Sequence, residues 1–283
     1  MMVLSFVQVE PLRRAREAGL EQAHLSPDLG LTLRPARLDA RGAEVEGSGR
    51  LSWAQIDEIA ASQHACFEVE VDLSRKIQGF SELTNRVYSL FPTAGAPTML
   101  VSGFAMHRTQ GIDPMGDTQA KLRPLLDGAR RSIGRLLDTC TGLGYTAIEA
   151  AKHAIEVVTI ELDPMAQEIA RRNPWSSRLF SEPSIRRLLG DACETITTFA
   201  DRSFDRILHD PPTLSLGGEL YSLAFYREAH RVLAPRGRIF HYIGDPRSAS
   251  GAKVTQGVAR RLHAAGFRRI DPRPEAFGLV ASK

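Results

Sequence analysis

Apolar and polar positions alternate in two different ways along the chain, and the pattern changes near residue 115. Before that point, short alternating runs are separated by turn residues. Residues 66–71, for example, have one apolar and one polar face, as in a half-buried strand. From residue 133 onward, strand-length apolar runs are each followed by a helix-compatible segment, which is the pattern of a parallel sheet. We predict a small α+β accessory domain over 1–115 and an α/β domain over 116–283.

Turn and capping residues refine these elements. Residues near 10–23 predict a short basic helix that ends at Gly19. Ser52 and Gln55 form a capping box, which predicts the start of a second helix. Residues 29–38 and 43–46 predict a hairpin, and a short strand at 98–102 lies within a turn-rich stretch over 92–121. In the second domain we expect helices over 218–233 and 255–265, with a closing hairpin at the end of the chain.

A glycine turn after the first strand of the second domain predicts a nucleotide-like ligand. Asp138 ends an apolar run, Gly142 and Gly144 follow it, and a helix-compatible segment starts directly afterwards. Glycine allows a sharp turn and a close approach of the backbone to the ligand. This spacing alone leaves both dinucleotides and S-adenosylmethionine (SAM) open. A carboxylate inside the loop repels a pyrophosphate but suits the ammonium group of SAM.

Two further strands also end in acids. Glu161 ends the next strand, about twenty residues on, where a ribose hydroxyl pair is held. Asp191 ends a third strand, placed for the adenine edge. Each acid alone is also a plausible helix N-cap, yet three in succession favour SAM. With the terminal hairpin, they indicate the seven-stranded, Rossmann-like sheet of class I methyltransferases. We include the neighbours of these residues in the predicted cofactor site, namely Thr139, Leu162 and Ala192.

Asp210-Pro211-Pro212 ends the fourth strand, at the edge where open α/β sheets place their ligands. An exocyclic amine is a poor nucleophile because its lone pair is delocalised into the ring. A carboxylate and a backbone carbonyl that accept its N–H bonds localise that lone pair. The prolines fix the turn and remove competing donors. Thr213, which follows them, cannot stack on a base, so Tyr221 and Tyr242 are candidates for that role.

Two further residues, His107 and Arg108, lie between chain breakers before the cofactor strand, where polar side chains often line a site entrance. We take them as candidate substrate contacts, with plain loop packing as the alternative. The chain carries a net charge of +3, which permits a nucleic-acid partner without requiring one. Its three cysteines lack metal-ligand spacing, so no metal is expected. No stretch is long enough to span a membrane, and the expected location is the cytoplasm.

Several segments resemble a family of predicted archaeal SAM-dependent methyltransferases. They are residues 137–145, 161–164, 209–212, 218–222 and 240–246, and the likeness extends to residues 106–108 and to the tail 276–280. It thus covers nearly the whole chain and is weakest before residue 80. The resemblance implies a class I core in which Asp138, Gly142 and Glu161 hold SAM and Asp191 holds the adenine. It also implies that Asp210-Pro211-Pro212 presents the target amine. Some members are taken to methylate N4 of cytidine in ribosomal RNA, so RNA, as rRNA or a ribosomal subunit, is the expected partner.

Alternative functions remain open at this point. The nearest are methylation of N6 of adenine and methylation of an amine in DNA. An aminopropyltransferase of the spermidine-synthase type shares the fold and uses decarboxylated SAM, but residues 211–215 lack the second acid that a polyamine site usually needs. A catalytically silent SAM-fold assembly factor is the third possibility. For base modification, the target must leave its stack to reach the pocket, and the first domain would hold the surrounding RNA.

Overall fold

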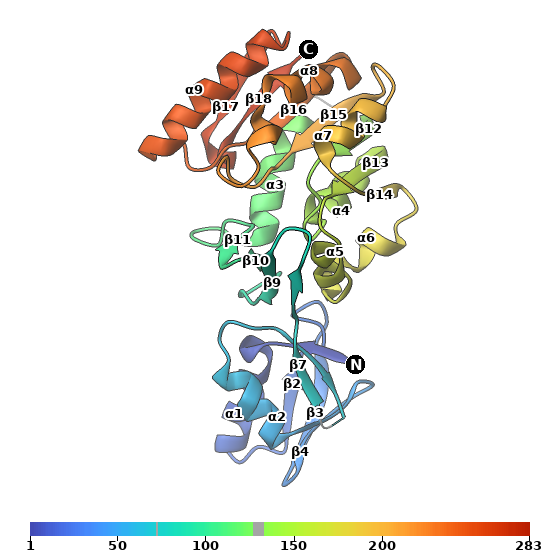
Figure 1. Cartoon of the computed structure of the whole chain (residues 1–283). Helices are drawn as coiled ribbons and strands as arrows, with labels where there is room; N and C mark the ends of the chain where they lie inside the picture. Colours follow the sequence, from blue (N-terminus) through green and yellow to red (C-terminus); the bar gives the residue numbers. More distant parts are fainter. Residues whose placement is uncertain (72, 127–132) are drawn as a thin grey trace. The chain divides into compact units, whose positions relative to one another are not determined.

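A computed structural model describes residues 1–71, 73–126 and 133–283. Figure 1 labels many of its helices and strands. The chain forms two compact units. The first unit comprises Met1–Met115 and Met165–Ser177, and the second comprises Gly116–Pro164 and Arg178–Lys283. The segment 165–177, which the sequence places in the second domain, therefore lies in the first unit. Trp175 within it donates from Nε1 to the carbonyl of Leu29 (3.0 Å).

Within the described residues, the first unit contains three antiparallel sheets, the helices α1 (Phe6–Glu17) and α2 (Trp53–Ala61), and, from the segment 165–177, most of α5 (Pro164–Arg171) and the short η1 (Pro174–Ser176). One sheet has the order β1-β6-β7, another β2-β3-β4-β5, and the third β11-β10-β9-β8. The strands are β1 (Met2–Leu4), β2 (Gln22–Leu25), β3 (Arg34–Asp39), β4 (Gly42–Val45), β5 (Gly49–Ser52), β6 (Phe67–Glu70), β7 (Leu73–Lys76), β8 (Gln78–Ser81), β9 (Arg86–Phe91), β10 (Thr98–Val101) and β11 (Phe104–Ala105).

The predicted elements of this unit are found with shifted ends. The hairpin β3–β4 is confirmed, and α2 starts at the predicted capping box of Ser52 and Gln55. Helix α1 begins earlier than expected because Ser5 and Gln8 form a second capping box. The core of the unit gathers the inward faces of α1, α2 and the sheets β1-β6-β7 and β2-β3-β4-β5, including Leu12, Leu51 and Ile56, which are fully buried.

The second unit is built on one seven-stranded sheet with the order β14-β13-β12-β15-β16-β18-β17. The first five strands run parallel, and β18 is antiparallel to both of its neighbours. This confirms the predicted α/β fold with its terminal hairpin. The strands are β12 (Ile133–Asp138), β13 (Ala154–Glu161), β14 (Ile185–Leu189), β15 (Phe204–His209), β16 (Leu233–Tyr242), β17 (Arg269–Arg273) and β18 (Gly278–Ser282).

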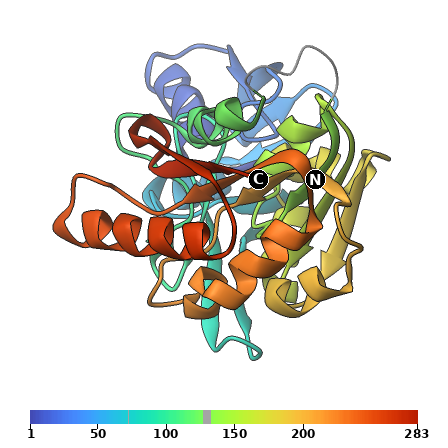
Figure 2. The same cartoon turned by 90° about the horizontal axis from the view of Figure 1, so that it is seen from above.

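Helices cover both faces of this sheet. Helices α8 and α9 lie on one face, and α3 and α4 lie on the other (Figure 2). The helical elements of the chain from residue 114 onward are α3 (Pro114–Leu126), α4 (Tyr145–Ala151), α5 (Pro164–Arg171), η1 (Pro174–Ser176), α6 (Ser177–Ser181), α7 (Ala192–Thr195), η2 (Ile196–Thr198), η3 (Gly218–Tyr221), α8 (Leu223–Val232), α9 (Ala249–Ala264) and η4 (Pro274–Ala276). Among the described residues, no helix has the length and apolar character needed to span a membrane.

Three helix predictions need correction. Helix α3 begins at Pro114, inside the stretch expected to be turn-rich, because proline is well tolerated in the first turn of a helix. The helix expected over 218–233 is interrupted at Ser222, whose side chain accepts from the amide of Phe225 and caps α8. Helix α9 begins before its predicted start because Ser248 caps it.

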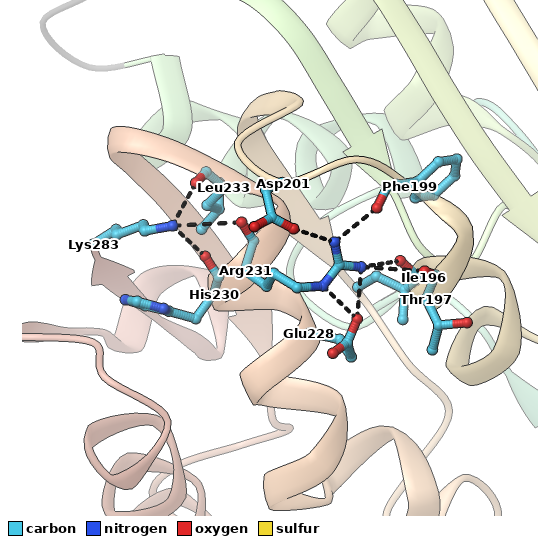
Figure 3. Close-up of polar contacts among 9 residues, drawn as sticks. All are labelled: Ile196, Thr197, Phe199, Asp201, Glu228, His230, Arg231, Leu233 and Lys283. Carbon is cyan, nitrogen blue, oxygen red and sulfur yellow. Dashed lines mark hydrogen bonds and ion pairs between the residues drawn. The ribbon is translucent and has the colours of Figure 1, made fainter.

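The C-terminal end of α8 is fastened by two cationic side chains (Figure 3). Lys283 donates from Nζ to the carbonyls of His230 and Leu233, both at 2.7 Å. Arg231 donates to the carbonyls of Phe199 and Ile196 and pairs with Glu228 and Asp201, among others. Carbonyls at a helix end lack intrahelical donors, and cations there also complement the helix dipole. These contacts tie α8 to the loop before β15 and to the end of β18.

Candidate active site

The loop between β12 and α4 has the backbone geometry that its glycines suggest. Gly142 and Gly144 have φ values of +53° and +75°, in the left-handed region that favours glycine. Gly144 is the N-cap of α4, and a Cβ added to it would lie 2.6 Å from Cδ2 of Leu179. An alanine here would therefore have to move a packed side chain as well as adopt a strained backbone.

Asp138, at the end of β12, is fully buried and has one carboxylate oxygen, Oδ1, with no hydrogen-bond partner among the described residues. Its Oδ2 accepts from the hydroxyls of Thr159 (2.9 Å) and Thr146 (3.2 Å). Because Thr159 donates its hydroxyl hydrogen to Asp138, the Thr141 hydroxyl must be the donor in its hydrogen bond to the Thr159 oxygen (2.6 Å). Burial raises the pKa of Asp138 to about 7, against the effect of the threonine hydroxyls, and the charge of Asp210 adds to the rise.

Glu161, at the end of β13, lies directly across from the glycine turn. Its Oε2 accepts from the amide of Gly142 (2.8 Å) and its Oε1 from the amide of Asp163 (3.0 Å). The residue is partly exposed, but its carboxyl group is enclosed by protein atoms, which raises its pKa to about 7. The next residue, Leu162, is 46% exposed and offers an apolar surface beside the carboxylate.

Asp191 follows β14 and takes the role of a helix cap. Its Oδ1 accepts from the amide of Cys193 at 2.6 Å, at the start of α7. Ala192 is buried behind it. Glu161 is in register with Leu189, two residues before Asp191, so these two acids follow neighbouring strand ends. The capping contact leaves the side chain partly exposed at this edge of the sheet.

The Asp210-Pro211-Pro212 corner follows β15, the strand next to β12. Asp138 is in register with Leu208, and the amide of Thr139 donates to the Leu208 carbonyl (3.1 Å). The pKa of the Cys140 thiol is raised by burial first and then by the charges of Glu161, Asp138 and Asp210. The Asp-Pro-Pro corner and the glycine turn therefore lie within electrostatic reach of one another.

The residues proposed for stacking are already engaged. Tyr221 is only 2% exposed and donates from its hydroxyl to the Pro212 carbonyl (3.1 Å), which braces the corner. The ammonium of Lys121 lies over the ring of Tyr242, 4.5 Å from the ring centroid.

The two candidate substrate contacts, His107 and Arg108, lie in the first unit, where Nδ1 of His107 is 2.9 Å from the Thr98 hydroxyl.

A buried lysine beside Asp210 was not predicted from the sequence. Nζ of Lys121 lies 2.6 Å from Oδ2 of Asp210 and 2.8 Å from Oδ2 of Asp117. Lys121 is 1% exposed, Asp117 is fully buried, and the Asp210 side chain is 20% exposed. Although desolvation opposes it, the two carboxylates raise the pKa of Lys121 above its usual value. The sequence signal was the i, i+4 spacing of Asp117 and Lys121 after Pro114, which is meaningful only once the helix is recognised.

Two buried histidines behind the corner were also missed. Nε2 of His209 lies 2.9 Å from the Leu220 carbonyl, which can only accept, so Nδ1 accepts from the Thr139 hydroxyl (2.6 Å). By the same reasoning Nδ1 of His241 donates to the Tyr242 carbonyl, and Nε2 accepts from Tyr226 (2.7 Å). Burial lowers both pKa values, that of His209 to about 3. Both rings are therefore neutral, and they support the cofactor loop and η3 without adding charge.

The acids along this edge fit S-adenosylmethionine or its decarboxylated form. The unpartnered Oδ1 of Asp138 is a buried acceptor suited to an ammonium donor, and the Glu161 carboxylate is suited to ribose hydroxyls. Across residues 1–71, 73–126 and 133–283, no group of three or more His, Cys, Asp and Glu side chains is arranged to hold a metal ion. The three cysteines are free. The site is thus a row of carboxylates around a glycine turn, with one cation, Lys121, built in at the Asp210 end.

Comparisons with known proteins agree with this architecture. Residues 136–237 match the model of a family described as a methyltransferase domain. The chain is 44% identical over 200 residues to the uncharacterized protein MJ1233 of Methanocaldococcus jannaschii. The matched region covers 70% of this chain and 68% of that protein.

Aminopropyltransferases are a second group of similar proteins. The chain is 30% identical over 171 residues to polyamine aminopropyltransferase 2 of Streptomyces coelicolor, covering 58% of this chain but only 30% of that protein. Among solved structures, it resembles a spermidine synthase in complex with the transition-state analogue AdoDATO. That likeness has a TM-score of 0.61 at 20% identity and covers 77% of this chain and 79% of the other. At this identity it establishes a shared fold.

Proposed function

This chain belongs to the family of the M. jannaschii protein MJ1233, and from that premise we propose that it transfers a group from an S-adenosyl sulfonium to an amine nitrogen. One observation carries the proposal. Asp138 holds a buried carboxylate oxygen that no group in the described part of the chain hydrogen-bonds, close to a second acid, Asp210, whose charge is already paired with Lys121. The first suits a cationic donor, and the second suits an acceptor that brings no positive charge.

The candidate reaction that these charges favour is methylation of a neutral ring amine. SAM, when bound, supplies an electrophilic methyl carbon on a sulfonium. Asp138 and Glu161 hold the ammonium and the ribose of the donor. Asp210 accepts an N–H bond of the amine, which localises the nitrogen lone pair, and it takes the proton released when nitrogen bonds to carbon. Such positioned proton acceptance contributes about 10² to 10⁴ in rate.

RNA is the acceptor that we propose for this reaction, with N4 of cytidine in ribosomal RNA as the specific target. The proposal is supported by the Asp-Pro-Pro corner and by the resemblance of the chain to archaeal methyltransferases. Because the base must leave its stack, the first unit, with His107 and Arg108, is the candidate for holding the neighbouring RNA. Nucleoside mass spectrometry of ribosomal and transfer RNA from a deletion strain tests this. Loss of N4-methylated cytidine supports it, and an unchanged set of methylated bases contradicts it.

Aminopropyl transfer to a polyamine is the second candidate, and the comparisons favour it. The similarity to a polyamine aminopropyltransferase and to spermidine synthase supports decarboxylated SAM as donor. Against it, residues 211–217 contain no acid, and Lys121 places a cation beside the acceptor carboxylate.

Calorimetry with SAM, decarboxylated SAM and NAD separates the candidates. Tighter binding of SAM supports methyl transfer, and tighter binding of its decarboxylated form supports aminopropyl transfer. Preference for NAD would contradict both, since both use a sulfonium donor.

A further inference from the structure

Lys121 has an arrangement that packing alone does not explain. Within the second unit, its side chain is 1% exposed, with the ammonium between the carboxylates of Asp117 and Asp210 and over the ring of Tyr242. Removing an ammonium from water is costly, and apolar residues of similar volume often stabilise a fold at least as well as a buried ion pair does. One of its two partners, Asp210, is the acid at the reaction corner. This pairing connects the lysine directly to the acid at the reaction corner.

We propose that Lys121 is the positioning residue of the acceptor site, which holds the Asp210 carboxylate ionised and in a fixed orientation and makes the site select neutral amines. This inference rests on the proposed transfer to an amine. The groups that face the ammonium are Asp117 on its own helix, Asp210 after β15 and the ring of Tyr242 on β16. Asp138 and Tyr221 lie farther off, within the field of Asp210.

The positioning role follows from the distances. At 2.6 Å, Nζ of Lys121 makes a charge-assisted hydrogen bond to Oδ2 of Asp210, which fixes the carboxylate in one rotamer. A nearby cation also favours the ionised form of a carboxyl group. The second carboxylate, Asp117, keeps the lysine in place and charged. Asp210 thus remains an acceptor of N–H bonds over a wider pH range than an isolated acid would.

The selectivity follows from the same charge. A polyamine is cationic at neutral pH, and an ammonium bound to Asp210 would lie close to the Lys121 ammonium. Two like charges about 5 Å apart, at the effective dielectric constant of about 20 that suits protein sites, repel enough to weaken binding by about 10²-fold. The Asp117 carboxylate beside the same ammonium offsets part of this repulsion. An exocyclic ring amine is neutral and avoids this repulsion. Lys121 therefore favours a nucleobase acceptor over a polyamine.

The test uses the full chain and three single variants. Lys121→Met removes the charge and keeps most of the length, and Lys121→Arg keeps the charge. Arg123→Met is the matched control, because Arg123 is an exposed cation two residues along the same helix. For each protein, SAM and putrescine affinities are measured by calorimetry. Single-turnover transfer to unmodified ribosomal RNA is followed against pH with saturating SAM.

We expect Lys121→Met to bind SAM within a few fold of wild type and to transfer 10- to 100-fold more slowly at neutral pH. The acid limb of its pH–rate profile should move to higher pH by about one unit. In Lys121→Arg the limb should return to its wild-type position. Lys121→Met should also bind putrescine at least tenfold more tightly than wild type does, a readout that needs no activity. Arg123→Met should match wild type throughout.

A Lys121→Met protein with the wild-type pH profile and unchanged putrescine affinity would overturn the inference, even while wild type transfers methyl groups. If wild type binds no sulfonium donor or transfers no group, the proposed function itself fails, which is a different outcome. Should Lys121→Met not fold, the double variant Lys121→Met/Asp117→Asn removes the unpaired buried acid. A shifted acid limb in that protein supports the inference, and an unshifted limb overturns it.

Discussion

The two ends of the candidate site use buried carboxylates in opposite ways. At the donor end, Asp138 and Glu161 have no cationic partner among the contacts described, and burial raises the pKa of each to about 7. At the acceptor end, Asp210 is paired with a buried lysine that is itself held by Asp117. Because an unpaired buried charge is costly, the difference indicates what each ligand brings. The donor supplies its own positive charge, and the acceptor does not.

The largest expected effect is at the acceptor end. Asp210→Asn should lower the rate of transfer by about 10² to 10⁴, because the amide is a poor proton acceptor. Affinity for SAM should stay within a few fold, since Asp210 does not hold the donor. Single-turnover kinetics and calorimetry on one preparation measure both quantities. Equal loss of rate and donor affinity would mean that Asp210 serves the structure of the whole edge.

Asp138→Asn should produce the opposite result. Loss of a charge-assisted hydrogen bond at a buried site weakens SAM binding by roughly 10- to 100-fold. The ligand-free variant should melt no lower than wild type at neutral pH and above, because the amide removes a carboxylate that is costly to ionise. Calorimetry and thermal unfolding check the two effects. Lower stability without a change in affinity would contradict the assignment of this acid to the donor.

The pH dependence should also differ between the two ends. Below about pH 7 Asp138 and Glu161 become protonated, so SAM affinity should fall by roughly tenfold between pH 7.5 and 6 for each group that must ionise. The stability of the ligand-free chain should change in the opposite direction. The raised pKa values stabilise the fold at low pH, and this contribution is lost as pH rises from about 4 through 7. Asp138→Asn should reduce the pH dependence of both SAM affinity and the stability of the ligand-free chain.

The smallest effect concerns the glycine turn. Gly144→Ala should lower stability by about 1–3 kcal/mol, because φ is +75° and the new Cβ meets Leu179. SAM affinity should fall with it, while the acid limb of transfer stays unchanged. Gly218→Ala is the matched control, since a Cβ there has no neighbour within 4 Å. Equal effects of the two substitutions on stability would remove the argument for a strained donor loop.

The sequence predicted the elements of this site better than their electrostatics. The strand ends with their acids, the glycine turn and the closing hairpin follow from local patterns of a few residues. Lys121 and Asp210 are 89 residues apart, and their contact depends on a helix hidden among turn residues. The tautomers of His209 and His241 depend on which carbonyls face them. Likewise, the unpartnered oxygen of Asp138 is defined by where Thr146 and Thr159 place their hydroxyls.

The most direct test of this account is the number of protons released when SAM binds. Calorimetry at pH 7, in buffers with different ionisation enthalpies, measures it for wild type and Asp138→Asn. Because Asp138 and Glu161 are about half protonated at that pH without ligand, wild type should release roughly half a proton or more, and the variant clearly less. Binding of SAM with no proton release in wild type would contradict the claim that these acids await a cationic donor.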